Sequence, residues 1–519
     1  MADFPGHEAV VGVLLHWGDA SFFPADLYVH NWGHPNQLQY ALALPLACLI
    51  GTTRALEVVV ALGVASIILG TARLARHLGR PEWVGVLAAP VAAGWSLHLG
   101  FIANLLGLGA FLWMLPELDG FTRDPRWRGA AGVLGGLVLL YFAHEAALVS
   151  AMLAIAVLSV AHGGSVARYA LRAAPCIAAA GGAYLQLKLR HLTEVNRFGL
   201  APMSLEERLH DVPWTTVGYY DFNRAPLVFT GIVLIVALNA ARVRVPLLGE
   251  KRALSKPLPN LATRGAFVRF RFVALGLSLL LGYLVLPASY EGILFLCHRF
   301  LPVAWCVLIV ATAAPSGARW QRAGAIACAG VPAVMLALLI PPLLDSDAAY
   351  RRLDALLPAI DRGAAVFSVE FDRGPLRVFN PRGFSTRFAQ GHIVAQRGGR
   401  ALADYTQSPI SPALVNPAFA WQAAGRDNFL DPTMFHPAIV FAQFRYVMVH
   451  ASAPELGRAV QNALRSEARL VAQNADWQLF ESTILETRSL DVAEPTAPAD
   501  AGDALLDRLR ASTAIRPKR

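Results

Sequence analysis

The stretch RALEVVVALGVASIILGTARLARHLGR, residues 54–80, indicates the class to which this chain belongs. Residues 54–72 are almost entirely apolar, and about 20 apolar residues are enough for a helix to cross the hydrocarbon core of a bilayer. Arg73, Arg76 and Arg80 follow directly, and basic residues concentrate in the cytoplasmic loops of membrane proteins. The stretch therefore predicts a transmembrane helix that ends in a cytoplasmic turn.

The composition of the whole chain agrees with a polytopic membrane protein. The 519 residues are 55% hydrophobic and only 16% charged, whereas a soluble domain is about 25% charged. The mean hydropathy is +0.45. The net charge of +9 is explained by basic cytoplasmic loops, and no motif of a nucleic-acid-binding protein accompanies it. We expect no nucleic-acid partner.

Apolar runs of suitable length recur along the first two thirds of the sequence. They predict about ten transmembrane helices, near 54–72, 83–98, 100–116, 129–143, 146–162, 170–188, 226–241, 272–289, 294–313 and 323–343. The pair 129–143 and 146–162 could also be one broken segment. Residues 36–50 are apolar but short and contain Pro45, which favours an interfacial or re-entrant helix and leaves a true span open.

The distribution of Lys and Arg predicts the orientation. Basic residues crowd the loops 73–82, 117–128, 163–172, 242–271 and 314–322, whereas residues 1–53 contain none. The basic loops are therefore expected in the cytoplasm, with the N-terminal segment and everything after residue 343 outside. This alternation supports two separate spans within 129–162.

The sequence predicts four regions. Residues 1–53 are expected to form an external loop with interfacial helices, and residues 54–343 the α-helical transmembrane domain. Strand-like runs at 364–371 and 444–450 and an amphipathic helix at 454–468 predict a small external α/β domain over 344–485. Residues 486–519 have the composition of a disordered tail.

Polar residues at the outer ends of the predicted spans are the candidates for a binding site, because ionisable groups are costly in a membrane and are often functional there. His144 and Glu145 could contact a substrate or a metal, or form an ordinary polar turn. Arg299 could bind a lipid phosphate, or pair internally with Glu291. His98 lies at another outer turn.

The first 35 residues form the densest polar cluster, with Asp3 and His7 at its start. His30 and His34 have the spacing of zinc ligands on a helix. Carboxylates could instead hold a divalent cation, Mg²⁺ or Mn²⁺, beside a phosphate. A solvated interfacial loop without a ligand is the third interpretation.

Three stretches resemble the start of the GT-C-type membrane glycosyltransferases, in an uncharacterised bacterial branch of that superfamily. They are DFPGHEAVV (3–11), HPNQLQYALALPLACLIG (34–51) and the run at 54–80. In that superfamily a first helix leads to an external loop with a catalytic Asp, and the resemblance places that role on Asp3. The family's preceding helix is not found in this sequence, so we expect that the first transmembrane helix is missing.

The resemblance implies an enzyme of the bacterial inner membrane. This enzyme would transfer a sugar from a polyprenyl-phosphate-linked donor to an envelope acceptor on the outer face of the membrane. Asp3 would act as the general base, and membrane lipids would surround the protein. We expect His7, His98, His144, Glu145, Glu291 and Arg299 to complete its substrate site. The competing class is non-enzymatic, a transporter or an envelope scaffold, although the sequence lacks the paired halves of many transporters.

Overall fold

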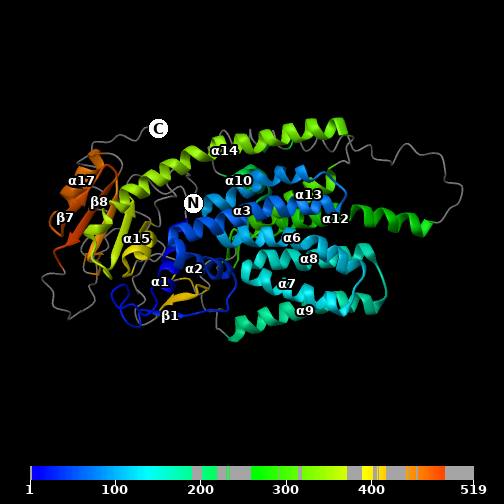
Figure 1. Ribbon diagram of the computed structural model, residues 1–519, viewed down its shortest axis with the longest axis horizontal. Helices are drawn as coiled ribbons and strands as arrows, with labels where there is room; N and C mark the ends of the chain where they lie inside the picture. The colour runs from blue at the N-terminus through cyan, green and yellow to red at the C-terminus, as the bar shows by residue number, and fades with distance from the viewer. Residues whose placement is uncertain are drawn as a thin grey trace. The chain divides into compact units, whose positions relative to one another are not determined.

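The computed structural model describes a large part of the chain (Figure 1). The described residues are 3–189, 201–218, 229–230, 233, 259–290, 293–313, 318–370, 389–400, 406, 408, 410–416, 440–441, 443–451 and 454–484.

The chain forms two compact units, and each draws on segments that are distant in sequence. Residues 33–39 and 57–339 make up the first, which we call the helical unit. Residues 1–32, 40–56 and 340–519 make up the second, which we call the sheet unit. The sheet unit therefore joins the start of the chain to its end.

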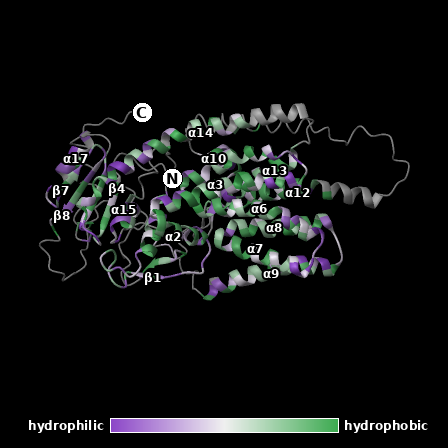
Figure 2. Cartoon of the chain, viewed as in Figure 1, coloured by the Kyte–Doolittle hydropathy of each residue, from purple (hydrophilic) through white to green (hydrophobic). Residues whose placement is uncertain are grey.

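Three helices in the described part of the helical unit have the length and composition to cross a membrane. They are α3 (Thr52–His77), α6 (Ile102–Arg123) and α8 (Glu145–His162). Figure 2 shows hydrophobic residues along these helices. The apolar helices point to a membrane location for the protein.

The remaining elements of this unit surround or connect these three. They are η1 (Glu82–Ala88), α4 (Ala89–Ala92), α5 (Trp95–Leu99), α7 (Trp127–Ala143), α9 (Val166–Leu189), α10 (Leu205–Val217), α12 (Pro259–Val285), β2 (Ser289–Tyr290), β3 (Ile293–Leu294), η3 (Cys297–Arg299), α13 (Phe300–Thr312) and α14 (Ala318–Asp354), the last of which continues into the sheet unit.

Two sequence predictions about this unit have different outcomes. Residues 129–162 form two separate helices, α7 and α8, as predicted. Residues 83–98 do not form one continuous span, because the run is divided among η1, α4 and α5. Gly94 separates α4 from α5, and a side chain there would meet the carbonyl oxygen of Thr216 at 2.6 Å. The helix α10 therefore packs closely against the backbone at Gly94, where the chain breaks between α4 and α5.

Close packing of α3 against α6 depends on glycine. A Cβ on Gly70 of α3 would lie 2.9 Å from the Cβ of Leu112, and a Cβ on Gly109 of α6 would collide with the Ser66 side chain. Small residues let the backbones of membrane helices approach each other, so that van der Waals contacts hold them together.

A four-stranded sheet forms the centre of the sheet unit, in the order β4-β6-β8-β7. The strands are β4 (Val366–Glu370), β6 (Tyr446–His450), β7 (Ala468–Gln473) and β8 (Trp477–Ser482). The pair β4 and β6 is parallel, and the other two pairs are antiparallel. The strands β4 and β6 fall where the sequence predicts them, and the helix α17 (Pro454–Leu464) begins at the predicted residue and ends before the predicted end at residue 468.

Alternate residues of the strands enter two different hydrophobic clusters. Phe367, Val447 and Phe480 pack with residues of α17. Val366, Met448 and Leu479 pack with the end of α14, with η4 (Leu357–Ala359) and with α15 (Ala389–Arg397). Successive side chains of a strand point to opposite faces, so this sheet is covered on both sides.

The start of the chain corrects a sequence prediction. Residues 4–15, expected in an external loop, form the helix α1 (Phe4–Leu15) with Pro5 in its first turn and nearly every side chain buried. Proline is favoured at that position of a helix. Gly12 of α1 lies against Ala395, and Gly391 of α15 lies against Pro5. The absence of side chains at both glycines lets the two helices pack closely.

Two further elements of the N-terminal segment belong to the sheet unit. β1 (Tyr28–His30) pairs antiparallel with β5 (Ala413–Val415). α2 (Leu38–Ile50) has 13 residues with Pro45 inside, which is too short to cross a bilayer.

Candidate functional site

Arg299, His144 and Glu145 form one polar site in the helical unit. The Nη1 of Arg299 lies 2.5 Å from Nε2 of His144 and donates to Oε1 of Glu145 at 2.8 Å. The side chains of His144 and Arg299 are only 4% and 12% exposed, and that of Glu145 is 29% exposed. We call this set the Arg299 site.

The local fold explains why these side chains meet. His144 has extended backbone angles and lies between α7 and α8, where its Nδ1 accepts from the backbone N–H of Ala146 at 3.1 Å. A Cβ on Gly107 of α6 would lie 2.6 Å from the Cβ of His144. The glycine therefore lets α6 approach the beginning of α8 and fixes the position of the imidazole.

Two helices begin at this site, since α8 starts at Glu145 and α13 starts directly after Arg299. The N-terminus of a helix carries partial positive charge and unpaired N–H groups. At α13 the 3-10 turn η3 continues directly into the helix, and the N–H of Phe300 donates to the carbonyl oxygen of Cys297. The guanidinium beside the N-terminus of α8 forms an environment suited to an anion with several oxygens, such as a phosphate.

Glu145 balances the charge of Arg299. Its carboxylate also receives a side-chain hydrogen bond from Asn36, a residue of the helical unit. A neutral imidazole has one acceptor nitrogen, so His144 can accept fully from Arg299 or from Ala146 but not from both. An arriving anion could therefore take over a contact of Arg299 at low cost.

The other predicted site residues occupy different places. The Nδ1 of His98 lies 2.9 Å from the carbonyl oxygen of Gly94 on the helical unit. In the sheet unit, the Nδ1 of His7 lies 2.7 Å from the hydroxyl of Tyr40, and Asp3 immediately precedes α1. Glu291 lies outside the described residues. The expected convergence of all these side chains on one cavity stays a prediction.

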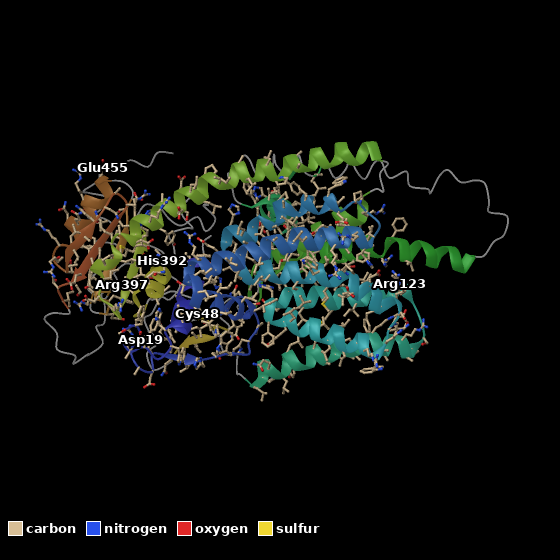
Figure 3. The ribbon with its side chains drawn as sticks, in the orientation of Figure 1. Asp19, Cys48, Arg123, His392, Arg397 and Glu455 are labelled. Carbon is tan, nitrogen blue, oxygen red and sulfur yellow. The ribbon has the colours of Figure 1, made fainter. Side chains whose placement is uncertain are left out.

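A buried ion-pair cluster in the sheet unit was not anticipated from the sequence. Figure 3 labels His392 on α15. The Nδ1 of His392 lies 3.0 Å from Oε2 of Glu8, and its Nε2 lies 2.7 Å from Oδ1 of Asp354. Burial alone would lower the pKa of His392, but the two carboxylates outweigh it and raise that pKa to about 10. The imidazole is therefore a cation that holds α1 and α14 to α15.

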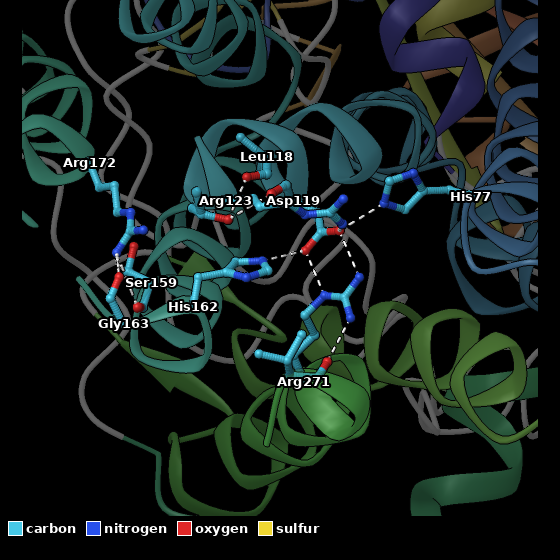
Figure 4. A network of polar contacts seen from close by, with 11 residues as sticks. His77, Leu118, Asp119, Arg123, Ser159, His162, Gly163, Arg172 and Arg271 are labelled. Atoms are coloured by element: carbon cyan, nitrogen blue, oxygen red, sulfur yellow. Dashed lines mark hydrogen bonds and ion pairs between the residues drawn. The ribbon is translucent and has the colours of Figure 1, made fainter. Parts of the chain in front are cut away.

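A second unanticipated cluster surrounds Asp119 near the end of α6 (Figure 4). Its fully buried carboxylate accepts from Nε2 of His77 at 2.8 Å and from Nε2 of His162 at 2.9 Å. Nε and Nη2 of Arg271 donate to it at 2.6 and 2.8 Å, and Arg123 lies at 3.2 Å. One carboxylate thereby joins α3, α6, α8 and α12, and we call this set the Asp119 cluster.

A sequence signal existed for the Asp119 cluster. His77 and His162 are the last residues of two apolar helices, and Asp119 lies in the last two turns of a third. Ionisable groups at such depth are expected to pair with one another. By sequence, however, Asp119 falls in the basic loop 117–128, where a carboxylate needs no buried partner.

The predicted divalent cation stays a prediction. Among the residues that the structure describes, no three or more His, Cys, Asp or Glu side chains are grouped as they would be around a metal ion. His30, one of the two histidines with zinc-like spacing, stacks on Trp17 with ring centroids 3.6 Å apart.

Comparisons with known proteins give one distant likeness. No protein-family model and no curated protein matches the chain. Among solved structures, the arabinofuranosyltransferase AftD from mycobacteria is similar with 16% sequence identity and a TM-score of 0.42. The match covers 93% of this chain and 40% of AftD, so the chain spans less than half the length of that protein.

Proposed function

We propose that this chain is a membrane glycosyltransferase that uses a polyprenyl-phosphate-linked sugar as donor. The Arg299 site is the observation that carries the proposal, because it places a largely buried guanidinium at the beginning of α8 in a unit with membrane-length helices. The resemblance of residues 3–11, 34–51 and 54–80 to GT-C enzymes supplies the reaction class.

The proposed reaction exchanges one bond at the anomeric carbon of the sugar. The acceptor hydroxyl oxygen bonds to that carbon, the bond from the carbon to the donor phosphate oxygen breaks, and the polyprenyl phosphate leaves as an anion. Asp3 takes the hydroxyl proton as general base. Arg299 binds the phosphate and stabilises the charge that develops on the leaving oxygen.

The proposed location is the bacterial inner membrane. The basic loops face the cytoplasm in this proposal, and the N-terminal segment and the sheet unit lie on the outer side. The donor and the surrounding membrane lipids are the proposed partners, together with an envelope acceptor.

Transfer of labelled sugar from synthetic polyprenyl-phosphate donors by membranes containing the full chain tests this function. In Arg299→Gln the loss of one charge-assisted phosphate contact should raise the KM for donor by roughly tenfold or more. Arg126→Gln is the matched control, because Arg126 is an exposed arginine whose side chain pairs with Asp124 at 2.6 Å.

Two results would contradict the proposal. An unchanged donor KM in Arg299→Gln would remove the phosphate role of the Arg299 site. No transfer by the wild-type chain from any pentose or hexose donor, in membranes where the protein is folded, would favour the non-enzymatic alternative, a transporter or an envelope scaffold.

A further inference from the structure

A hollow of about 690 Å³ opens on the helical unit between the C-terminal part of α3, the beginning of η1 and the middle of α6. Its walls include Leu69, Arg73, Glu82, Trp113 and Glu117. None of its lining residues belongs to the Arg299 site, so a separate role has to be considered.

One wall of the hollow is apolar and faces outward. Leu69 and Trp113 are 55% and 39% exposed, and they lie on α3 and α6, two helices long enough to span a membrane. Large exposed apolar side chains on such helices are placed to contact lipid tails, and Trp prefers the interface between tails and headgroups.

The charged wall lies further along α3. Arg73 and Arg76 follow Leu69 by four and seven residues, which corresponds to about 6 and 10 Å along a helix. The hollow therefore changes from apolar to charged over a distance similar to the step from acyl chains to headgroups. A molecule that fits it is amphiphilic.

Both signs of charge are present. The guanidinium of Arg73 lies 5.2 Å from the Trp113 ring centroid and 2.5 Å from Oε1 of Glu117. Arg76 makes a bidentate pair with Glu82 at 2.6 and 2.7 Å. The side chains of the two glutamates are 68% and 52% exposed. Exposed ion pairs of this kind contribute little to stability. The two arginines can therefore exchange their glutamate partners for an anionic group of a ligand, and the two glutamates can bind a cationic group.

His77 makes the base of the hollow rigid. It lines the hollow, and its Nε2 is held by the buried carboxylate of Asp119 at 2.8 Å. The end of α3 is thereby fixed to α6, and the two arginines extend from a preorganised backbone.

We propose that this hollow binds the headgroup of a glycerophospholipid that carries both a phosphate and a primary ammonium, the phosphatidylethanolamine class. Arg73 and Arg76 bind the phosphate. Glu117 and Glu82 accept hydrogen bonds from the ammonium. The acyl chains run along Leu69 and Trp113.

Lipid retention by the purified full chain tests this assignment. The delipidated protein is exposed to phosphatidylethanolamine, phosphatidylcholine or phosphatidylglycerol with identical acyl chains, and bound lipid is measured by native mass spectrometry. Phosphatidylethanolamine should be retained roughly tenfold better, the equivalent of one charge-assisted hydrogen bond. Equal retention of the three lipids would overturn the proposal, and so would a preference for phosphatidylglycerol.

Paired variants separate the two halves of the headgroup. Arg73→Gln with Arg76→Gln should lower phosphatidylethanolamine retention roughly tenfold, whereas Glu82→Gln with Glu117→Gln should remove the preference over phosphatidylglycerol. Arg126→Gln with Asp124→Asn, an exposed pair outside the hollow, should change neither. Unchanged phosphatidylethanolamine retention in the arginine variant, or an unchanged preference over phosphatidylglycerol in the glutamate variant, would overturn the proposal.

A measurement on the unmodified chain keeps the test independent of variant folding. A photoreactive phosphatidylethanolamine should label peptides from the end of α3 and the middle of α6. Labelling distributed evenly over the apolar helices would show ordinary solvation by lipid and would overturn the assigned site.

Discussion

At the residue scale, His392 shows how two carboxylates determine the charge of a buried imidazole. Its pKa is raised from 6.5 to about 10, so the folded protein keeps a proton there that the unfolded chain loses above pH 6.5. The stabilisation is complete below pH 6.5 and is lost as the pH rises toward 10. We therefore predict that the sheet unit unfolds more readily with rising pH in this window.

Amide hydrogen exchange in α1 and α15 at several pH values, corrected for intrinsic exchange rates, measures this effect. His392→Gln should flatten the pH dependence and destabilise the unit by roughly 3 kcal/mol, because Glu8 remains buried beside a neutral partner. The same pH slope in wild type and variant would show that other groups cause it.

Asp3 is the second residue with a specific prediction. If it is the general base, Asp3→Asn keeps the shape of the side chain and should lower sugar transfer by roughly 10²–10⁴-fold. Asp19→Asn is the matched control, because Asp19 is exposed and hydrogen-bonds Ser21. Near-normal turnover by Asp3→Asn would exclude Asp3 as the base.

At the scale of elements, the Asp119 cluster determines how the four helices α3, α6, α8 and α12 are joined. Asp119→Asn leaves Arg271 without its buried counter-charge, so we predict destabilisation by about 3–5 kcal/mol. Thermal unfolding of the purified chain in detergent measures it. Asp124→Asn, which removes an exposed pair with Arg126, should cost only about 0–1 kcal/mol. Equal melting temperatures for the two variants would show that the Asp119 cluster contributes little.

At the scale of the whole molecule, orientation in the membrane is the property open to test. The distribution of Lys and Arg predicts that a reporter active only in the cytoplasm is silent when fused after residue 485 and active when inserted at residues 163–165, between α8 and α9. Activity of the fusion after residue 485 would reverse the orientation and place the sheet unit in the cytoplasm.

The sequence alone predicts the features that depend on local pattern. The apolar runs of α3, α6 and α8, the division between α7 and α8, and the strands β4 and β6 were all predictable, because length, hydropathy and period suffice to recognise a membrane helix or a buried strand. The prediction of residues 83–98 as one span was wrong. The hydropathy of a segment carries no information on the close packing of α10 against Gly94.

Which residues form the polar clusters, and that the N-terminal segment is a buried helix, depends on the tertiary structure. Glu8 and His392 are separated by 384 residues, Arg299 and His144 by 155, and Asp119 and Arg271 by 152. The polar start of the sequence predicts a solvated loop, because Glu8 and His7 are costly to bury without hydrogen-bond partners. The fold supplies those partners from α14, α15 and α2, and the same residues then form a buried helix.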